Sequence, residues 1–394
     1  MNNFTYHIPT KVFFGQGVIE NLPAAAKSLG TKALLVYGGG SIKKNGLYDS
    51  ILSLLKEIDM PVYELSGVEP NPRIESVRAG IETLRENGID LIIAAGGGSA
   101  MDCAKAIAAG AHNESEAWDV VMNPALIDPA DVPPIIAIPT LSATGSEMDE
   151  IGVISNLAIP LKKPLYHACL RPAVAIMDPV YTYSVSRFQT GSGTADIFSH
   201  IQEVYFNRNA GAFASDKICE GLMKTVLKYG RIAIDEPENY EARSNLMWTS
   251  TLGINGLIKC GKETHLWMPC HAIEHVASAY YDIPHGAGLA VITPHWMRKI
   301  LCDATVGKFA EYGVNVFGID ASLPPYEIAE KAIEATKDFF VSLDMPLTLY
   351  ELGIREDSKL EAMAKDVVET GGITRSFYPI GYEEVLDIFR KSWK

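Results

Sequence analysis

The chain has 394 residues, 47% of them hydrophobic, which is more than a single hydrophobic core usually supports, so we expect two domains. Its formal net charge of -14 and pI of about 5.1 would repel phosphate backbones and anionic lipid headgroups. Composition therefore argues against nucleic-acid and membrane partners and favours a small-molecule substrate.

The N-terminal stretch lacks the pattern of a secretory signal. In "MNNFTYHIPTKVFFGQG" no basic region precedes an apolar one, and no uncharged apolar run in the chain approaches the roughly 20 residues that cross a bilayer. We therefore expect a soluble cytoplasmic protein. The six cysteines show no C-x-x-C spacing, which argues against a disulfide framework and against a thiolate zinc site.

Short apolar runs rich in β-branched residues recur in the first half of the chain, beginning at Lys32, Pro61, Asp90 and Pro133. Between them lie helical patterns such as "YDSILSLLKEI" and "IESVRAGIETLREN", in which apolar residues recur at helical intervals. Strands that are apolar throughout and alternate with helices indicate a parallel sheet covered on both faces. We predict a doubly wound, Rossmann-like α/β domain.

Two of the predicted strands end in glycine-rich turns, "YGGGS" and "AGGGS". In open parallel sheets, ligands bind beyond the carboxyl ends of the strands, where glycine lets the backbone approach a phosphate. The second turn begins a helix whose first N–H groups can hold a pyrophosphate. Neither turn matches G-x-G-x-x-G well, but together they predict a dinucleotide site. Its residues are Gly39, Gly40 and Ser41 in the first turn and Gly97, Gly98 and Ser99 in the second.

The first turn also indicates which dinucleotide binds. Selection of NAD usually depends on a carboxylate near the ribose 2′-hydroxyl, whereas NADP needs room and positive or hydroxyl groups for its 2′-phosphate. Along this turn stand Ser41, Lys43 and Lys44, and no carboxylate. We therefore expect NADP(H) to be favoured over NAD(H).

After "AVAIMDPVYTYSV" the strands end and long helical patterns follow, at 195–206, 214–233, 241–259, 326–343 and 358–369. Several of these segments are apolar around most of the helix, which is typical of the interior helices of a bundle. We predict an α/β dinucleotide-binding domain at 1–183 and an all-α metal-binding domain at 184–394.

The predicted helical domain contains side chains that could bind a metal ion. Asp196 and His200 are spaced i, i+4, which places both on one helix face. His271 lies on another helical pattern, and His285 follows a turn that can direct it back towards the first three. One carboxylate and three imidazoles suit Fe(II) and also accept Zn(II). With a divalent ion, the formal charge of this set is about +1.

The residues from His271 to His275 also read H-x-x-E-H, the pattern of inverted zinc peptidases, in which both histidines bind zinc and the glutamate is the base. A metallopeptidase would give no role to the glycine turns or to the strand-rich half, so we disfavour it. On a helix Glu274 points about 100° away from His275, which suits a salt bridge or a contact behind a ligand better.

Further motifs occur in order along the chain: "IPTKVFFGQG", "YGGGSIKKNGLYD", "VEPNP", "GGGSAMDCAKAIA", "IPTLSATGSEMD", "IMDPVYTY", "TADIFSH" and "HAIEHVASAYYDIPHGAGLAV". In this order and spacing the sequence resembles the iron-containing, group III alcohol dehydrogenases, and most of all their butanol dehydrogenase and broad aldehyde reductase branch. The resemblance implies a dehydroquinate-synthase-like architecture, with the active site in a cleft between the two domains, and a homodimer. The family's "TTSGTGSE" is here "TLSATGSE", and Asp149 stands where the family can have Asn.

The resemblance also implies roles for single residues. The family's metal ligands fall on Asp196, His200, His271 and His285, and His275 falls on a histidine that lines the cleft near the nicotinamide. NAD-preferring relatives carry an aspartate near the position of Gly39. The cofactor positions fall on Gly39, Gly40, Ser41, Asn71, Gly97, Gly98, Ser99, Asp102, Thr140 and Lys162, with Lys163 as the alternative to Lys162 if the register shifts by one.

We therefore expect a metal-dependent oxidoreductase that transfers a hydride between NADP(H) and a primary alcohol or its aldehyde, such as butanol and butanal. The metal would act as a Lewis acid on the substrate oxygen, and His275 would pass the proton towards solvent. Trp267 and Met268 are candidates for an apolar wall of the pocket. The alternatives are a polyol dehydrogenase of the same superfamily, a dehydroquinate-synthase-like lyase, which should carry more basic residues, and a non-catalytic nucleotide-binding protein.

Overall fold

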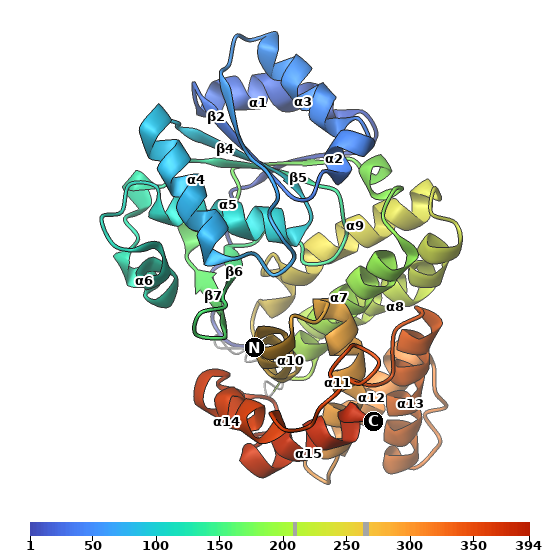
Figure 1. The fold of residues 1–394 in the computed structure, drawn as a ribbon. Coiled ribbons are helices and arrows are strands. Elements are labelled where there is room, and N and C mark those ends of the chain that lie inside the picture. Colours follow the sequence, from blue (N-terminus) through green and yellow to red (C-terminus); the bar gives the residue numbers. More distant parts are fainter. Residues whose placement is uncertain (208–210, 263–267) are drawn as a thin grey trace. The chain divides into compact units, whose positions relative to one another are not determined.

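The computed structural model describes residues 1–207, 211–262 and 268–394, drawn in Figure 1. The chain divides into two compact units. The sheet unit comprises His7–Val185 and Pro237–Thr251, and the helical unit comprises Met1–Tyr6, Ser186–Glu236 and Leu252–Lys394. The chain thus passes between the units four times, where the sequence suggested a single passage near residue 183.

The sheet unit is built on six parallel strands in the order β1-β8-β5-β4-β2-β3. The strands are β1 (Lys11–Phe14), β2 (Ala33–Tyr37), β3 (Val62–Leu65), β4 (Leu91–Gly96), β5 (Ile135–Pro139) and β8 (Val174–Met177). The antiparallel hairpin of β6 (Ile151–Asn156) and β7 (Leu161–Tyr166), which the sequence did not suggest, forms a separate sheet. The predicted doubly wound parallel sheet is confirmed.

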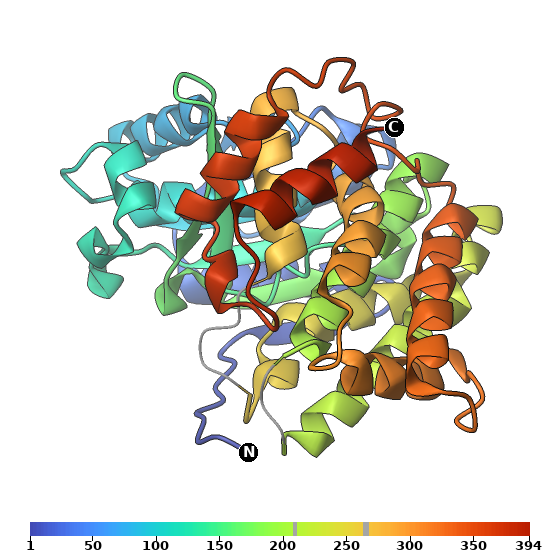
Figure 2. The same cartoon turned by 90° about the horizontal axis from the view of Figure 1, so that it is seen from below.

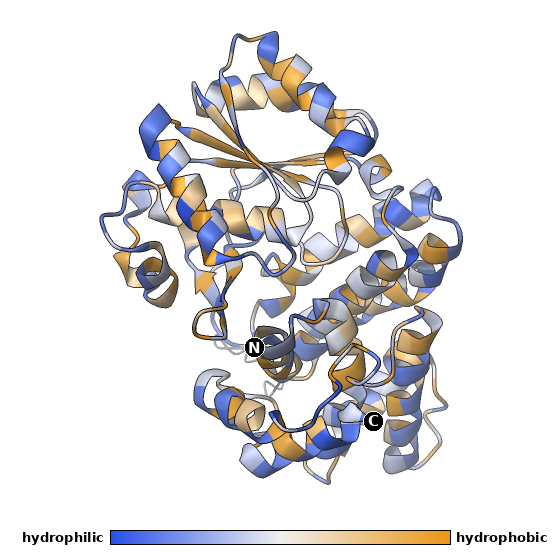
Figure 3. Cartoon of the chain, viewed as in Figure 1, coloured by the Kyte–Doolittle hydropathy of each residue, from blue (hydrophilic) through white to orange (hydrophobic). Residues whose placement is uncertain are grey.

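The central strands are buried on both faces because each face meets its own layer of helices. Along β2, Leu34 and Val36 join one hydrophobic core, and Ala33, Leu35 and Tyr37 join another. This explains why these strands are apolar at every position, as their colour in Figure 3 shows. The first core contains α4 (Ile74–Asn87), α5 (Gly98–Gly110) and α6 (Ala117–Met122), and the second contains α1 (Leu22–Leu29), α2 (Ser41–Lys44) and α3 (Leu47–Lys56).

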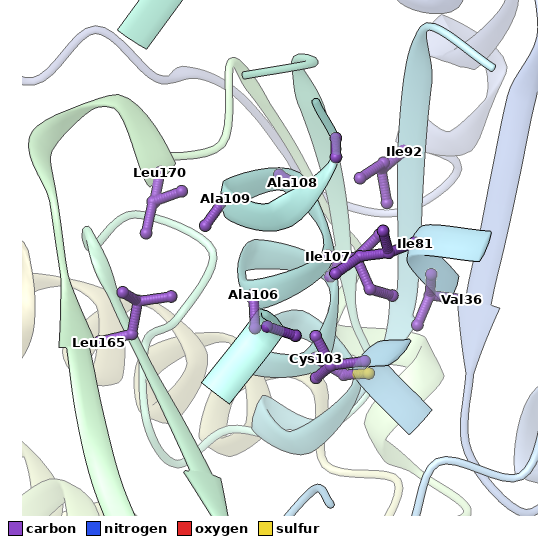
Figure 4. Packing of buried hydrophobic residues seen from close by; sticks show 14 of the residues in the cluster. Val36, Ile81, Ile92, Cys103, Ala106, Ile107, Ala108, Ala109, Leu165 and Leu170 are labelled. Carbon is purple, nitrogen blue, oxygen red and sulfur yellow. The ribbon is translucent and has the colours of Figure 1, made fainter. Parts of the chain in front are cut away.

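Figure 4 shows Ile81 of α4 and Ile107 of α5 in the first core, and each of them packs against a glycine of the other helix. A Cβ on Gly80 of α4 would lie 2.3 Å from Cδ1 of Ile107, and a Cβ on Gly110 of α5 would lie 2.4 Å from Cδ1 of Ile81. Each isoleucine therefore occupies space that the opposite helix leaves free by having no side chain. This close packing fixes α5, the helix that begins at the second glycine turn.

The helical unit contains α7 (Arg187–Tyr205), α8 (Phe213–Asp235), α10 (Pro269–Tyr281), α11 (His285–Ile300), α12 (Val306–Phe317), α13 (Pro325–Ser342), α14 (Leu360–Thr370) and α15 (Tyr382–Trp393). In α7 every residue from Thr190 to Tyr205 is buried, as the apolar pattern of 195–206 predicted. The helices α14 and α15 pack side by side (Figure 2). Among the described residues, no helix is both long and apolar enough to cross a membrane.

The helix α9 (Tyr240–Ile254) carries most of the segment that returns to the sheet unit. Met247 packs against Ala175 and Met177 of β8, and the Thr251 hydroxyl donates a hydrogen bond to the buried carboxyl of Glu147. Burial raises the pKa of Glu147 to about 7. The sequence placed this helix in the other domain, because nothing in its periodicity shows which core it joins.

We predict that Gly80→Leu lowers the melting temperature, because the added side chain overlaps Ile107 and overpacking costs about 1–3 kcal/mol. Adding Ile107→Ala should restore part of the loss by vacating that space. Thermal unfolding of both variants checks this. Gly221→Leu on α8 is the matched control, since nothing lies within 4 Å of the added Cβ there. An equal loss in the control would contradict the packing argument.

Candidate functional site

In the helical unit, one carboxylate oxygen is surrounded by three imidazoles. The Oδ1 atom of Asp196 lies 3.5 Å from Nδ1 of His200, 3.7 Å from Nε2 of His271 and 3.6 Å from Nε2 of His285. The rings of His200 and His271 are stacked with their centroids 4.4 Å apart. The structure therefore brings together the four residues that the sequence suggested as metal ligands.

Three helices present these side chains. Asp196 and His200 lie on one face of α7, His271 is in the first turn of α10, and His285 is the first residue of α11. The residue after His285 must be glycine, because a Cβ on Gly286 would lie only 2.0 Å from the carbonyl oxygen of Ser192. The first turn of α11 thus lies directly against α7.

The described residues of this cluster fit a divalent metal ion. Ligands bonded to zinc at about 2.0–2.2 Å in a tetrahedron lie about 3.3–3.6 Å apart, close to the separations seen here. Asp196 Oδ1 and His271 Nε2 are buried and have no hydrogen-bond partner among the described residues. Buried polar atoms without partners are rare, and a cation would satisfy both. The donor set of one oxygen and three nitrogens suits Fe(II) and Zn(II).

In this cluster the negative charge of the carboxylates and the positive charge of protonated imidazoles stabilise each other although the groups are buried. Burial opposes ionisation of Asp196, but the neighbouring histidines outweigh it and hold its pKa well below the usual range. Burial lowers the pKa of His200 to about 3. Burial also opposes protonation of His271, yet the Glu203 carboxylate and Asp196 outweigh it and raise its pKa to about 9.

Two buried glutamates lie behind the histidines. Glu203 Oε1 is 2.5 Å from Nδ1 of His271, and Glu274 Oε2 is hydrogen-bonded to Nδ1 of His285. The sequence suggested a supporting contact for Glu274 but did not single out Glu203. The signal was present, since Glu203 follows His200 by three positions and lies on the same face of α7.

His275, the expected catalytic histidine, is one turn after His271 on α10 and is half-buried. Its ring centroid lies 5.2 Å from that of His285 and 6.1 Å from that of His271. Glu274, His275 and His285 also approach one another closely enough to hold an ion, and within this group Glu274 Oε2 is already hydrogen-bonded to Nδ1 of His285. Met268 is half-buried just before α10, and Trp267 lies outside the described residues.

In the sheet unit, the second glycine turn lies at the start of α5. Gly96 has a φ of 157°, and Gly97 is the N-cap of α5. A Cβ on Gly98 would lie 2.6 Å from Oγ1 of Thr144, so glycine here lets the "ATGSE" segment approach the start of the helix. Thr140 follows β5, and its N–H donates to the carbonyl of Gly96. The expected cofactor residues Gly97, Gly98, Ser99 and Thr140 therefore lie at adjoining strand ends.

Two further predicted cofactor residues are hydrogen-bonded to each other. Lys162 Nζ on β7 donates a 2.9 Å hydrogen bond to Oδ1 of Asn71, whose φ is 52°. Residues alternate between the faces of a strand, so Lys162 and Lys163 lie on opposite faces of β7, and it is Lys162 that contacts Asn71; the cofactor role of either lysine stays a prediction.

Asp102, another predicted cofactor residue, has both carboxylate oxygens occupied within the protein. Oδ1 accepts from the Ser146 hydroxyl, and Oδ2 accepts from the N–H of Val153. Burial raises its pKa to about 6. These bonds tie α5 to β6.

Beside Asp102 lies a fully buried ammonium group that the sequence did not single out. Lys105 donates to the Ser146 hydroxyl, the Asp149 carboxylate and the carbonyl of Ile151, so each of its three protons has an acceptor. Asp149, the departure from the family pattern, is thus the counter-ion of a lysine whose side chain is 0% exposed.

At the first glycine turn, Gly39 and Ser41 are exposed, and nothing lies within 4 Å of a Cβ built on Gly39. Lys43 lies over the rings of Tyr37 and Tyr48, at 5.1 and 4.4 Å from their centroids. Both tyrosine hydroxyls donate to the carboxylate of Glu64 on the adjacent strand β3, and the hydrogen bond from Tyr37 contributes most to lowering its pKa. A carboxylate does therefore lie near this turn, but it comes from a neighbouring strand.

Comparison with known proteins agrees with this arrangement. The model of the iron-containing alcohol dehydrogenase family matches residues 9–179, and the model of the C-terminal part of the Fe-containing alcohol dehydrogenases matches residues 190–393. The chain is 52% identical over 394 residues to NADH-dependent butanol dehydrogenase A of Clostridium acetobutylicum, covering 100% of both chains. It is 35% identical over 378 residues to the NADPH-dependent aldehyde reductase YqhD of Escherichia coli, covering 94% of both.

A solved structure with the same fold is that of NADH-dependent butanol dehydrogenase A from Thermotoga maritima, with a TM-score of 0.94, 35% identity, and coverage of 100% of this chain and 99% of that one. The names of these relatives include both dinucleotides, and the relative at 52% identity is named for NADH, so the comparisons do not support the expected preference for NADP(H). The family matches leave no place for the zinc-peptidase alternative. The chain belongs to the iron-containing alcohol dehydrogenase family and is an oxidoreductase of alcohols and aldehydes.

Proposed function

We propose that this enzyme transfers a hydride reversibly between NADP(H) and a primary alcohol or aldehyde of the butanol and butanal class, and that it depends on Fe(II), with Zn(II) as a possible substitute. The observation that carries the metal dependence is the position of Asp196 Oδ1, which lies 3.5–3.7 Å from a nitrogen of each of three histidines in a buried place. The names of the relatives support the substrate class.

In this proposal Asp196, His200, His271 and His285 hold the metal, which when bound supplies a Lewis acid for the substrate oxygen. The protein contributes the fixed placement of these four donors. Asp196, His200 and His271 are buried and the His285 side chain is 22% exposed, so these residues would limit the access of water to the ion they hold.

His275 is proposed to accept the hydroxyl proton of the alcohol during oxidation and to pass it on towards solvent, and to return it during aldehyde reduction. Its ring lies beside His271 and His285, and it is more accessible than His271. Imidazole is suited to this role because its ordinary pKa is near neutrality.

The dinucleotide is proposed to bind along the two glycine turns, with Asn71 and Lys162 beside them. Preference for NADP(H) is supported by the open space at Gly39 and by the hydroxyl of Ser41. The charge of the Glu64 carboxylate opposes this preference, and Lys43, which lies over the two tyrosines that donate to Glu64, offers a compensating positive charge.

The first test is metal removal. Protein treated with a chelator should lose butanal reduction, and anaerobic addition of Fe(II) should restore it, measured as oxidation of NADPH and of NADH. His271→Ala should bind dinucleotide almost normally, by fluorescence titration, while turnover is abolished because one of the four donors is missing. Full activity in the metal-free protein would refute the proposed dependence. In the reverse direction with NADP⁺ or NAD⁺, faster oxidation of glycerol than of butanol would refute the substrate class.

The dinucleotide preference is tested by Gly39→Asp. The new carboxylate would repel a 2′-phosphate, so the ratio of kcat/KM for NADPH to that for NADH should fall by about tenfold or more, equivalent to about 1.4 kcal/mol. Gly39→Ala adds a Cβ without charge at a position with free space and should change the ratio little. If the native enzyme already prefers NADH, the proposed preference is wrong.

The role of His275 is tested by His275→Phe, which keeps an aromatic ring but cannot carry a proton. Turnover should fall by about 100-fold and the pH profile should change, because general acid-base catalysis contributes on that scale. His295→Phe is the matched control, since His295 is a half-buried histidine on α11 with no assigned role. An unchanged rate and pH profile in His275→Phe would remove the relay.

A further inference from the structure

We propose that Glu203 and Glu274 are positioning residues for the metal, and that each fixes the imidazole of a ligand on a neighbouring helix. The inference rests on the proposed metal dependence and goes beyond it, because neither carboxylate is in the set of four donors. A histidine that donates its Nδ1–H to a carboxylate is held in one tautomer and one ring orientation, with Nε2 left for the metal.

Glu203 makes this contact from α7 to α10. Its side chain is 0% exposed, its Oε1 lies 2.5 Å from Nδ1 of His271, and its Oε2 accepts a 2.7 Å hydrogen bond from the N–H of Cys270. That N–H is in the first turn of α10, where backbone donors have no partner within the helix. Glu203 therefore fixes both the start of α10 and the ring that α10 presents, and His271 Nε2 remains without a partner among the described residues.

Glu274 makes the equivalent contact from α10 to α11. Its Oε2 binds Nδ1 of His285, and its Oε1 accepts from the hydroxyl of Ser278 one turn later. The side chain is 0% exposed. Gly288 makes room for it, since a Cβ there would lie 2.8 Å from Cγ of Glu274.

Which ligands are held by a glutamate depends on the helix that carries each ligand. Asp196 and His200 are on the same helix, so the backbone of α7 sets the distance between them. His271 and His285 come from two other helices, and these are the two histidines that a buried carboxylate holds from the preceding ligand helix. The contacts thus form a series from α7 to α10 and from α10 to α11.

The two glutamates also change the charge at the site. A divalent ion with Asp196 alone has a formal charge of about +1, and inclusion of Glu203 and Glu274 brings it to about -1. Burial of two more carboxylates is costly unless they are paired, and here each has a histidine and a second donor. This arrangement should retain a cation tightly, because the surrounding charge is negative.

The test compares Glu203→Gln and Glu274→Gln with the native full-length protein, using Zn(II) and Co(II) as the probe metals. Affinity is measured by competition with a chelator, and Co(II) geometry by visible absorption. We expect each variant to bind about 10- to 100-fold more weakly with a shifted Co(II) spectrum, as loss of such partners usually gives. Glu220→Gln, on α8, is the matched control, because Glu220 is also buried but accepts from Tyr205 and Lys217 instead.

A purely structural role is separated by melting temperatures with and without metal. A positioning role predicts that the increase in melting temperature on adding Zn(II) becomes smaller in the glutamine variants, since ligand stabilisation follows affinity. Ser278→Ala removes one hydrogen bond to Glu274 but keeps the carboxylate, so it should weaken Zn(II) binding by a smaller factor than Glu274→Gln. This variant replaces Glu274→Gln in the test if Glu274→Gln does not fold.

Native affinity and an unchanged Co(II) spectrum in the glutamine variants would overturn the inference while the metal dependence stands. Failure of the native protein itself to bind these metals would overturn the proposed function and this inference together. The two failures are distinguishable, because the first appears only in the variants and the second in the unmodified chain.

Discussion

The helical unit is organised around one costly arrangement, a carboxylate and three imidazoles gathered where three of the four side chains are buried. Asp196 cannot ionise there without positive charge beside it, and its histidines cannot all be charged without repelling one another. A divalent cation resolves both difficulties at once. The need to bring donors from three helices to one point also explains the local sequence, since Gly286 is required where α11 meets α7 and Gly288 where α11 meets Glu274.

The sheet unit also buries charged side chains, and there each is satisfied by partners within the protein. Lys105, in the middle of α5, is fully buried, and its three ammonium protons are accepted by Ser146, Asp149 and Ile151. Asp102 is held by the same region. Satisfied buried networks are rigid, so this one fixes α5, the helix that begins at the second glycine turn, against residues 146–153. A backbone that must present N–H groups to a pyrophosphate benefits from being fixed before the ligand arrives.

The sequence allowed the parts of the fold with strong local patterns to be predicted. The helix expected at 74–87 is α4, and the uninterrupted apolar runs became strands of the parallel sheet. The spacing of Asp196 and His200 indicated one helix face, and the structure places them on one. Local patterns of this kind depend on neighbours along the chain, which a single sequence displays in full.

Contacts between distant segments could not be predicted in the same way. Glu64 lies near the first glycine turn because β3 pairs with β2, and Glu203 reaches His271 across 68 positions. The hairpin of β6 and β7 was missed because its sequence includes Pro160 and Pro164 and does not alternate clearly between apolar and polar residues. The sequence also does not show which domain α9 belongs to, because an apolar helix can pack against the core of the sheet unit or that of the helical unit.

The return of α9 to the sheet unit has a consequence for protein engineering. A chimera that joins two relatives near residue 185 would take its sheet from one parent and α9 from the other, since 237–251 follows the junction in sequence. Met247 would then face a foreign β8, and Thr251 would face a foreign Glu147 segment. Exchange of dinucleotide-binding regions between members of the family should therefore transplant two stretches of chain together, the first ending near 185 and the second spanning 237–251.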